Sequence, residues 1–241
     1  MTKQKPIRVY LADIKELENQ ELYQRLYPLV SKQRREKMDR LQDESKKRSS
    51  LAAELLLRRA LADWEQGIEH GNKKPEFQYT EHGNKELEFQ YTEHGKPYLD
   101  GIHFNLSHSE DRVMCVLSEK EVGCDVEKMA GLNLQFAKRF FAEQEYENIC
   151  SKESEEERRK TFYRIWTLKE SFMKATGLGM KLPLDSFAFS LENDQISVCQ
   201  SVNREKYYFK EYDLQDGYGY AVCGLVPEFE EIEWVTLSQC F

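Results

Sequence analysis

The spacing of apolar residues changes along this chain, and that change is the strongest constraint on its fold. Residues 7–14, IRVYLADI, alternate and are rich in β-branched and aromatic side chains, as strands are. Residues 50–64, SLAAELLLRRALADW, carry the continuous apolar stripe of a helix that packs on a core. The fold therefore begins with a strand and a long helix.

The rest of the chain repeats this order of elements. Residues 103–109 and 112–118 are typical of two strands around a Ser/His turn, and residues 122–128 of a third strand after a polar turn. An amphipathic helix follows and ends at Gly177, after which the chain returns to alternating strands. We therefore predict an α+β protein with two similar halves.

Composition indicates a folded chain without a general affinity for nucleic acid. The 241 residues are 40% hydrophobic, which is enough for one large domain or two small ones. The formal charge of -8 argues against a protein that binds nucleic acid by neutralising phosphates, so an anionic ligand must meet a local basic patch. Residues 31–48, with eight basic and four acidic side chains, are either such a patch or a solvated helix face.

Neither a membrane span nor a disulfide framework is predicted. No run approaches the roughly 18 apolar residues of a span, and Arg8 and Asp13 interrupt the first apolar stretch, unlike in a signal peptide. We therefore expect a cytoplasmic protein that does not bind membranes. The six cysteines lie far apart without CxxC or Cys/His ligand spacing, so we expect reduced, mostly buried thiols and no zinc site.

One short segment is duplicated in tandem. Residues 69–80, EHGNKKPEFQYT, recur as residues 81–92, EHGNKELEFQYT, with ten of twelve positions identical. One duplication of so short a unit is too short and too few for a solenoid, so it is interpreted as a local insertion of a turn and a short strand.

Two patterns place acidic side chains where a metal could bind. In GCDVE, Asp125 and Glu127 lie two apart on a strand, so both carboxylates point to one face and can hold a hard cation. In WTLKESFMKATG, Glu170 and Lys174 lie four apart on one helix face. Each pattern alone also fits a solvated acid pair or a helix ion pair. Together with the Ser/His turn, they suit an enzyme that handles a magnesium-bound pyrophosphate.

These patterns resemble the signature of the surfactin-type (Sfp-like) 4'-phosphopantetheinyl transferases. In that family a G-x-D-x-E strand precedes a W-x-x-K-E-x-x-x-K helix, here Gly123 to Glu127 and Trp166 to Lys174. Three further family segments follow the expected order in this chain: Gly95-Lys96-Pro97, Asn105-Leu106-Ser107-His108-Ser109 and Leu182-Pro183-Leu184-Asp185-Ser186-Phe187. The resemblance extends nearly from end to end.

The resemblance implies a pseudo-twofold pair of α/β subdomains, residues 1–122 and 123–241, in a monomer that binds coenzyme A between them. It implies transfer of phosphopantetheine from coenzyme A to a serine of an apo acyl or peptidyl carrier protein, with release of adenosine 3',5'-bisphosphate. Two alternatives are a holo-acyl-carrier-protein synthase, usually half this length and trimeric, and a catalytically silent module that binds coenzyme A or a carrier domain. The doubled architecture argues against the first, and the complete set of acidic residues and Lys174 against the second.

Site roles follow from the resemblance residue by residue. Asp125, Glu127 and Glu170 would bind Mg²⁺, and Glu170 is a candidate general base for the carrier serine, as ligand, base or both. Lys174 would contact the α-phosphate and stabilise charge that develops on the phosphoryl oxygens. The predicted coenzyme A contacts are Arg34, Lys37 and Arg48 with the 3'-phosphate, Lys96 beside Pro97 near the adenine and the 3'-phosphate, Ser107 with its backbone at the 3'-phosphate, and His108 at the pyrophosphate. At Arg48 the alignment is uncertain by one position, since a relative has arginine where this chain has Ser49.

Carrier proteins of this family are generally acidic, so a chain of charge -8 cannot attract them by net charge. Docking is predicted on a local apolar and basic segment after the metal strand, formed by Leu132, Leu134, Phe136, Lys138 and Arg139. The alternative is an ordinary amphipathic helix that faces the core.

The resemblance also distinguishes the two copies of the repeat. Relatives reach Gly-Lys-Pro through a single strand-like segment, and here residues 89–94 lead directly into Gly95-Lys96-Pro97. The second copy is therefore predicted to be the native strand, and residues 69–80 an exposed loop or hairpin.

Overall fold

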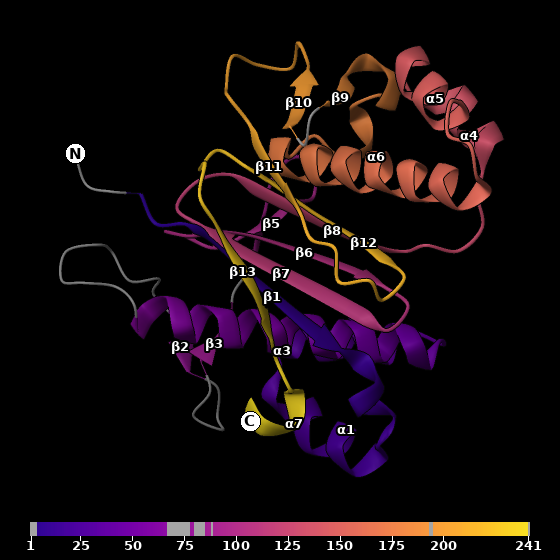
Figure 1. Ribbon diagram of the computed structural model, residues 1–241. Helices are drawn as coiled ribbons and strands as arrows, with labels where there is room; N and C mark the ends of the chain where they lie inside the picture. Colours follow the sequence, from indigo (N-terminus) through magenta and orange to yellow (C-terminus); the bar gives the residue numbers. More distant parts are fainter. Residues whose placement is uncertain (1–3, 67–77, 80–84, 88, 193–194, 241) are drawn as a thin grey trace.

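The computed structural model describes the chain except residues 1–3, 67–77, 80–84, 88, 193–194 and 241. It has two halves, each made of a strand, a long helix and a pair of strands (Figure 1). In the first half these are β1 (Ile7–Asp13), α3 (Glu44–Gln66), β6 (His103–Ser109) and β7 (Arg112–Ser118). In the second half they are β8 (Val122–Lys128), α6 (Glu155–Thr176), β11 (Tyr208–Glu211) and β12 (Tyr218–Gly224).

The two sheets have the same strand order. In the first, β7 lies between β1 and β6, and in the second, β12 lies between β8 and β11; all of these pairs are antiparallel. Each half therefore places its first strand beside its last one, as expected for two related α/β units, and the predicted α+β class is confirmed.

Strand β13 (Phe229–Trp234) breaks this symmetry. It leaves the second half and pairs in parallel with β1, with Ile7 opposite Phe229 and Leu11 opposite Trp234. The expected division was into residues 1–122 and 123–241. Strand β13 lies in the second of these ranges but belongs to the sheet of the first half.

The helices cover the outer faces of the two sheets, whose inner faces share a core (Figure 1). On β1 the alternation is visible: Ile7, Val9 and Leu11 belong to the core between the sheets, whereas Tyr10 and Ala12 belong to the core under α3. This division is the period-2 pattern of a strand buried on both faces. At Gly123 a Cβ atom would collide with the backbone of Ser171 and Ala175, so only glycine allows α6 to lie this close to β8.

Shorter elements complete the structure. Before α3 come the 3-10 turns Ile14–Glu18 and Tyr27–Leu29 and the helices α1 (Gln20–Leu26) and α2 (Lys32–Asp39). The remaining elements are β2 (Gln78–Tyr79), β3 (Lys85–Glu86), β4 (Gln90–Tyr91), β5 (Pro97–Tyr98), α4 (Leu134–Phe140), α5 (Glu143–Cys150), the 3-10 turns Gly179–Lys181 and Leu184–Ser186, β9 (Ala188–Glu192), β10 (Gln195–Cys199) and α7 (Leu237–Cys240). None of the described helices has the length and apolar character that a membrane span requires.

The second copy of the repeat is a structural part of the fold. Its β4 pairs with β5, Leu87 is buried, and Phe89 packs on the core beneath α3. Most of the first copy lies outside the described residues, but β2, near its end, pairs with β3 in the middle of the second copy. The two copies therefore meet in a short hairpin.

Candidate functional site

Strands β6 and β8, at the edges of the two sheets, run side by side in the same direction and are joined through side chains. Asn105 Oδ1, Ser107 Oγ and Ser109 Oγ accept hydrogen bonds from three alternate amides of β8, those of Cys124 (2.9 Å), Val126 (3.3 Å) and Lys128 (3.1 Å). We call this line of contacts the β6–β8 seam. It satisfies edge amides that would otherwise have no sheet partner.

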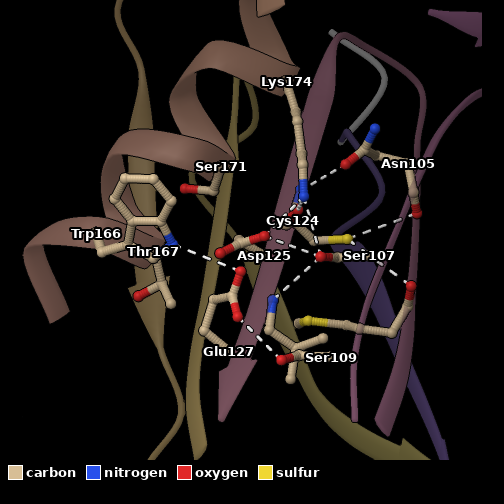
Figure 2. A network of polar contacts seen from close by, with 12 residues as sticks. Asn105, Ser107, Ser109, Cys124, Asp125, Glu127, Trp166, Thr167, Ser171 and Lys174 are labelled. Carbon is tan, nitrogen blue, oxygen red and sulfur yellow. Dashed lines mark hydrogen bonds and ion pairs between the residues drawn. The ribbon is translucent and has the colours of Figure 1, made fainter. Parts of the chain in front are cut away.

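The two serines of the seam also hold the two strand carboxylates. Ser107 Oγ donates to Asp125 Oδ1 at 2.8 Å, and Ser109 Oγ donates to Glu127 Oε2 at 2.9 Å. Trp166 Nε1, on α6, donates to Glu127 Oε1 at 3.5 Å. Figure 2 shows both carboxylates on the same side of β8, as their spacing predicted.

Lys174 links α6 to this seam. Its Nζ donates to Asp125 Oδ1 at 2.7 Å, Ser107 Oγ at 3.0 Å and Cys124 O at 3.1 Å (Figure 2). Burial lowers the pKa of Lys174, but the charge and the hydrogen bond of Asp125, together with Cys124 and Glu170, raise it by more, so the net pKa lies above its usual value. Lys174 is therefore a fixed positive charge.

The carboxylates are crowded in a way that favours a cation. Burial, followed by the charge of Asp125, raises the pKa of both Glu127 and Glu170. Burial also raises the pKa of Asp125, although Lys174 opposes this effect. Among the described residues, Asp125 Oδ2 is buried and has no hydrogen-bond partner. Three partly desolvated carboxylates thus face one ammonium group.

A cavity of about 780 Å³ joins these groups. The polar and charged side chains in its lining include Ser107, His108, Asp125, Glu127, Glu170 and Lys174. The apolar ones include Phe136, Phe140, Trp166, Met180, Leu182 and Leu184. A ligand with a charged head and a less polar arm would match such a mixed lining.

The donor set fits a magnesium ion that is bound jointly with a phosphate ligand. In the part of the chain that the structure describes, no three His, Cys, Asp or Glu side chains form a ready-made metal-binding group. The possible metal ligands in the cavity are Oδ2 of Asp125, which has no hydrogen-bond partner among the described residues, and the carboxylates of Glu127 and Glu170. Mg²⁺ usually takes one or two protein carboxylates and completes its octahedron with water and phosphate oxygens.

A group of cations adjoins the carboxylates. Burial, followed by the charges of Lys174, Lys37 and Arg34, lowers the pKa of His108. The structure therefore brings these predicted residues together from α2, β6 and α6. Arg34 is held by Glu54, with Nε 3.2 Å from Oε2, and by Ser50, whose Oγ is 3.4 Å from Nη1.

Arg48 and Lys96 have other surroundings. The charge of Arg48 acts on Tyr23 of α1, and its Nε is buried without a hydrogen-bond partner among the described residues. Lys96 Nζ binds Glu121 Oε2 at 2.7 Å and Val122 O at 3.2 Å. Burial raises the pKa of Glu121, but His103 and Lys96 together lower it to about 2.

These arrangements bear on the predicted coenzyme A contacts. Neither Lys96 nor Pro97 lines the cavity of about 780 Å³. The Ser107 hydroxyl already contacts Asp125, Val126 and Lys174, so a contact with the 3'-phosphate is left to its backbone. The assignments of Arg48, Lys96, Pro97 and Ser107 to coenzyme A stay predictions.

In the predicted docking segment the apolar side chains pack on the protein, as in the alternative of a core-facing amphipathic helix, and its role in docking stays a prediction. Leu132, Leu134 and Phe136 pack against the aromatic cluster of α4, α5 and α6, where the Phe136 ring lies 5.1 Å from that of Trp166. Lys138 and Arg139 are exposed on α4. The segment is an amphipathic helix whose apolar side faces the protein and whose basic side faces solvent.

Several important residues were missed by sequence reasoning. Lys169, the first lysine of the W-x-x-K-E-x-x-x-K motif, is fully buried and pairs with Glu145 at 2.8 Å. Its Nζ also donates to Leu184 O and Phe187 O, so it holds the segment that forms one wall of the cavity. The available signal was weak, since Glu145 lies on a separate helix.

Glu54 was also missed. It is completely buried and accepts hydrogen bonds from Ser31, Arg34 and Arg58. A single acid inside the apolar run SLAAELLL was a usable signal, because an acid is rarely buried unless it is paired.

Known proteins resemble this chain over most of its length. Residues 121–223 match the model of the 4'-phosphopantetheinyl transferase superfamily, ACPS. The chain is 33% identical over 214 residues to 4'-phosphopantetheinyl transferase Sfp of Bacillus subtilis (strain 168), covering 88% of this chain and 90% of that protein. It is 36% identical over 131 residues to 4'-phosphopantetheinyl transferase gsp of Aneurinibacillus migulanus, covering 54% and 55% of the two chains. Among solved structures, Thermotoga maritima holo-[acyl-carrier-protein] synthase (AcpS) matches with a TM-score of 0.38 and 22% identity, over 46% of this chain and 64% of that one.

Proposed function

The chain belongs to the Sfp-like 4'-phosphopantetheinyl transferases, and we propose that it moves phosphopantetheine from coenzyme A to a serine of an apo acyl or peptidyl carrier protein. The second product is adenosine 3',5'-bisphosphate. The observation that carries this proposal is the single cavity that contains Asp125, Glu127 and Glu170 beside the ammonium of Lys174. A silent binding module would not need to keep three crowded carboxylates.

Asp125, Glu127 and Glu170 would hold Mg²⁺ together with the pyrophosphate of coenzyme A. A metal held there would neutralise charge on the leaving bisphosphate. The unpartnered Oδ2 of Asp125 supports this assignment, since a buried carboxylate oxygen without a partner is costly.

The cations of the site bind and orient the phosphates. The lowered pKa of His108 keeps its imidazole neutral at neutral pH, so it can donate a hydrogen bond to a pyrophosphate oxygen. The charges of Arg34 and Lys37 both act on His108, and these two cations suit the 3'-phosphate. Lys174 stays protonated and stabilises the charge that develops on the phosphoryl oxygens.

Glu170 is the proposed proton acceptor. The serine oxygen forms a bond to the β-phosphorus while the bond from that phosphorus to the bisphosphate oxygen breaks, and the serine proton passes to Glu170. Glu170 lines the same cavity as Lys174 and His108, so its carboxylate lies close to the groups that would bind the phosphates.

A basic face on α4, with Lys138 and Arg139 exposed, suits an acidic carrier protein. We expect the enzyme to act as a cytoplasmic monomer.

The decisive test incubates the protein with an apo carrier protein and coenzyme A, with either Mg²⁺ or a chelator, and measures the carrier by mass spectrometry. The phosphopantetheine increment is expected only with Mg²⁺. Asp125→Ala and Glu127→Ala are expected to abolish it. Binding of coenzyme A without any transfer would instead identify a silent module.

Glu170→Gln separates the two roles of this residue. The variant removes a ligand charge and the proposed base, so transfer should fall at every Mg²⁺ concentration. Complete recovery at high Mg²⁺ would show that Glu170 is a ligand and not the base.

A further inference from the structure

Ser109 has a contact pattern that the proposed mechanism does not use. Its hydroxyl donates to Glu127 Oε2 at 2.9 Å and accepts from the Lys128 amide at 3.1 Å. Two residues earlier, Ser107 makes the same pair of contacts with Asp125 and the Val126 amide. In both cases the serine and its acid are 18 residues apart in sequence. Each serine therefore binds one carboxylate and the amide that follows it.

The two carboxylates differ in how firmly they are held. Asp125 is almost fully buried, and both Ser107 and Lys174 bind its Oδ1. Glu127 is less buried and has one more rotatable bond, and its second contact, with Trp166, is long at 3.5 Å. The charge of Asp125 on the same face of β8 also repels it. The hydrogen bond from Ser109 is the shorter of the two contacts of Glu127. It restricts the rotation of the Glu127 side chain and opposes its repulsion by Asp125.

We propose that Ser109 is a positioning residue that fixes the Glu127 carboxylate for metal binding. Ser109 acts through Glu127, from the opposite half of the molecule, and takes no part in proton or phosphoryl transfer. Because the contact crosses the β6–β8 seam, the orientation of this ligand depends on how the two halves pack. The inference rests on the proposed metal role of Glu127.

Direct metal binding tests this role without relying on activity. Mn²⁺ is titrated into the protein with coenzyme A present, and free Mn²⁺ is followed by electron paramagnetic resonance. Loss of a hydrogen-bond partner of a metal ligand typically weakens binding by about 10- to 100-fold, and we expect a loss of that size for Ser109→Ala. Ser109→Thr keeps a hydroxyl at the same place on the strand and is expected to restore affinity. Coenzyme A binding without metal should be the same in all three proteins.

Asn105→Ala is the matched control. It removes a third contact of the seam, with the Cys124 amide, but this contact does not involve a carboxylate. Thermal unfolding should show that Asn105→Ala and Ser109→Ala are both folded, and Mn²⁺ affinity should fall only in Ser109→Ala. Unchanged affinity in Ser109→Ala, or an equal loss in Asn105→Ala, would overturn the proposal. If the wild-type protein bound no Mn²⁺ with coenzyme A, the metal site itself would be wrong, and the role of Ser109 with it.

Discussion

At the scale of single residues, Lys174 shows how one side chain can serve both the fold and the chemistry. Its ammonium group, carried by α6, bonds Asp125 and Cys124 O on β8 and Ser107 on β6. These contacts keep it charged despite partial burial. His108 lies within the field of this charge and is kept neutral by burial and by the surrounding cations. The two residues therefore offer the phosphates a fixed charge and a neutral donor.

Lys174→Ala and His108→Ala are expected to affect different kinetic constants. Loss of a charge that acts in the transition state should lower kcat, whereas loss of a ground-state phosphate contact should raise the KM for coenzyme A. Steady-state kinetics at saturating carrier protein measures both. A change in KM alone for Lys174→Ala would assign this lysine to binding.

At the scale of elements, the buried pair Lys169–Glu145 joins α5, α6 and the segment that leads into β9. Glu145 also accepts hydrogen bonds from the amides of Ala142 and Phe189, and Lys169 donates to two carbonyls of residues 184–187. Its Nζ lies 4.3 Å from the centre of the Phe187 ring. The position of one cavity wall therefore depends on an ion pair outside the cavity.

Glu145→Ala is expected to lower the free energy of unfolding by about 3–5 kcal/mol, because it leaves the Lys169 ammonium buried without a counterion. Urea denaturation measures this loss. The double variant Glu145→Met/Lys169→Met should lose less, since no charge is left buried. A loss in the double variant as large as in the single one would mean that the pair contributes through its backbone contacts instead.

The repeat gives a second prediction at this scale. The second copy contributes Leu87 to the core and places the Phe89 ring 6.0 Å from the guanidinium carbon of Arg34. Loop closure becomes only slowly more costly with length, about 0.6 kcal/mol per doubling, so the fold can carry the first copy as an insertion. Deletion of residues 69–80 should leave the KM for coenzyme A and the melting temperature nearly unchanged. A large rise in that KM would show that the first copy belongs to the site.

At the scale of the whole molecule, the site is formed where the two halves meet, and its charge affects stability. Asp125 and Glu127 lie on β8 and Glu170 on α6, while His108 and the seam serines come from β6. The pKa values of the three acids are raised in the folded protein. Folding therefore opposes the ionisation of these three carboxyl groups. A bound cation would favour their ionised forms and so offset this effect.

The stabilisation by Mg²⁺ with coenzyme A is predicted to increase with pH. Because the three pKa values are raised, these groups stabilise the folded protein fully below the ordinary carboxyl pKa near 4, and this contribution is lost as pH rises through their folded values. A metal binds the ionised form. The rise in melting temperature on adding both ligands should thus be larger at pH 7 than at pH 5. An equal rise at both values would contradict the assignment of these acids as ligands.

The local sequence determined the helices and strands, which side chains share a face of each element, and the family. Periods of two and of 3.6 residues identify the strands and long helices, and the D-x-E spacing alone places Asp125 and Glu127 on one face. Local spacing also assigned His108 to a strand and Lys174 to a helix. It did not reveal that the charge of Lys174 acts on His108.

Only the tertiary structure decided which of these elements meet. The contacts of Ser107 and Ser109 with the acids of β8, the pairing of Lys169 with Glu145 and the crossing of β13 to the first sheet join residues whose separations follow no local period. Arg48 shows the same limit, because its place in a basic run did not reveal that it lies near Tyr23. Periodicity specifies a side chain's face, whereas its partner depends on how sheets and helices pack, and that packing is a property of the entire core.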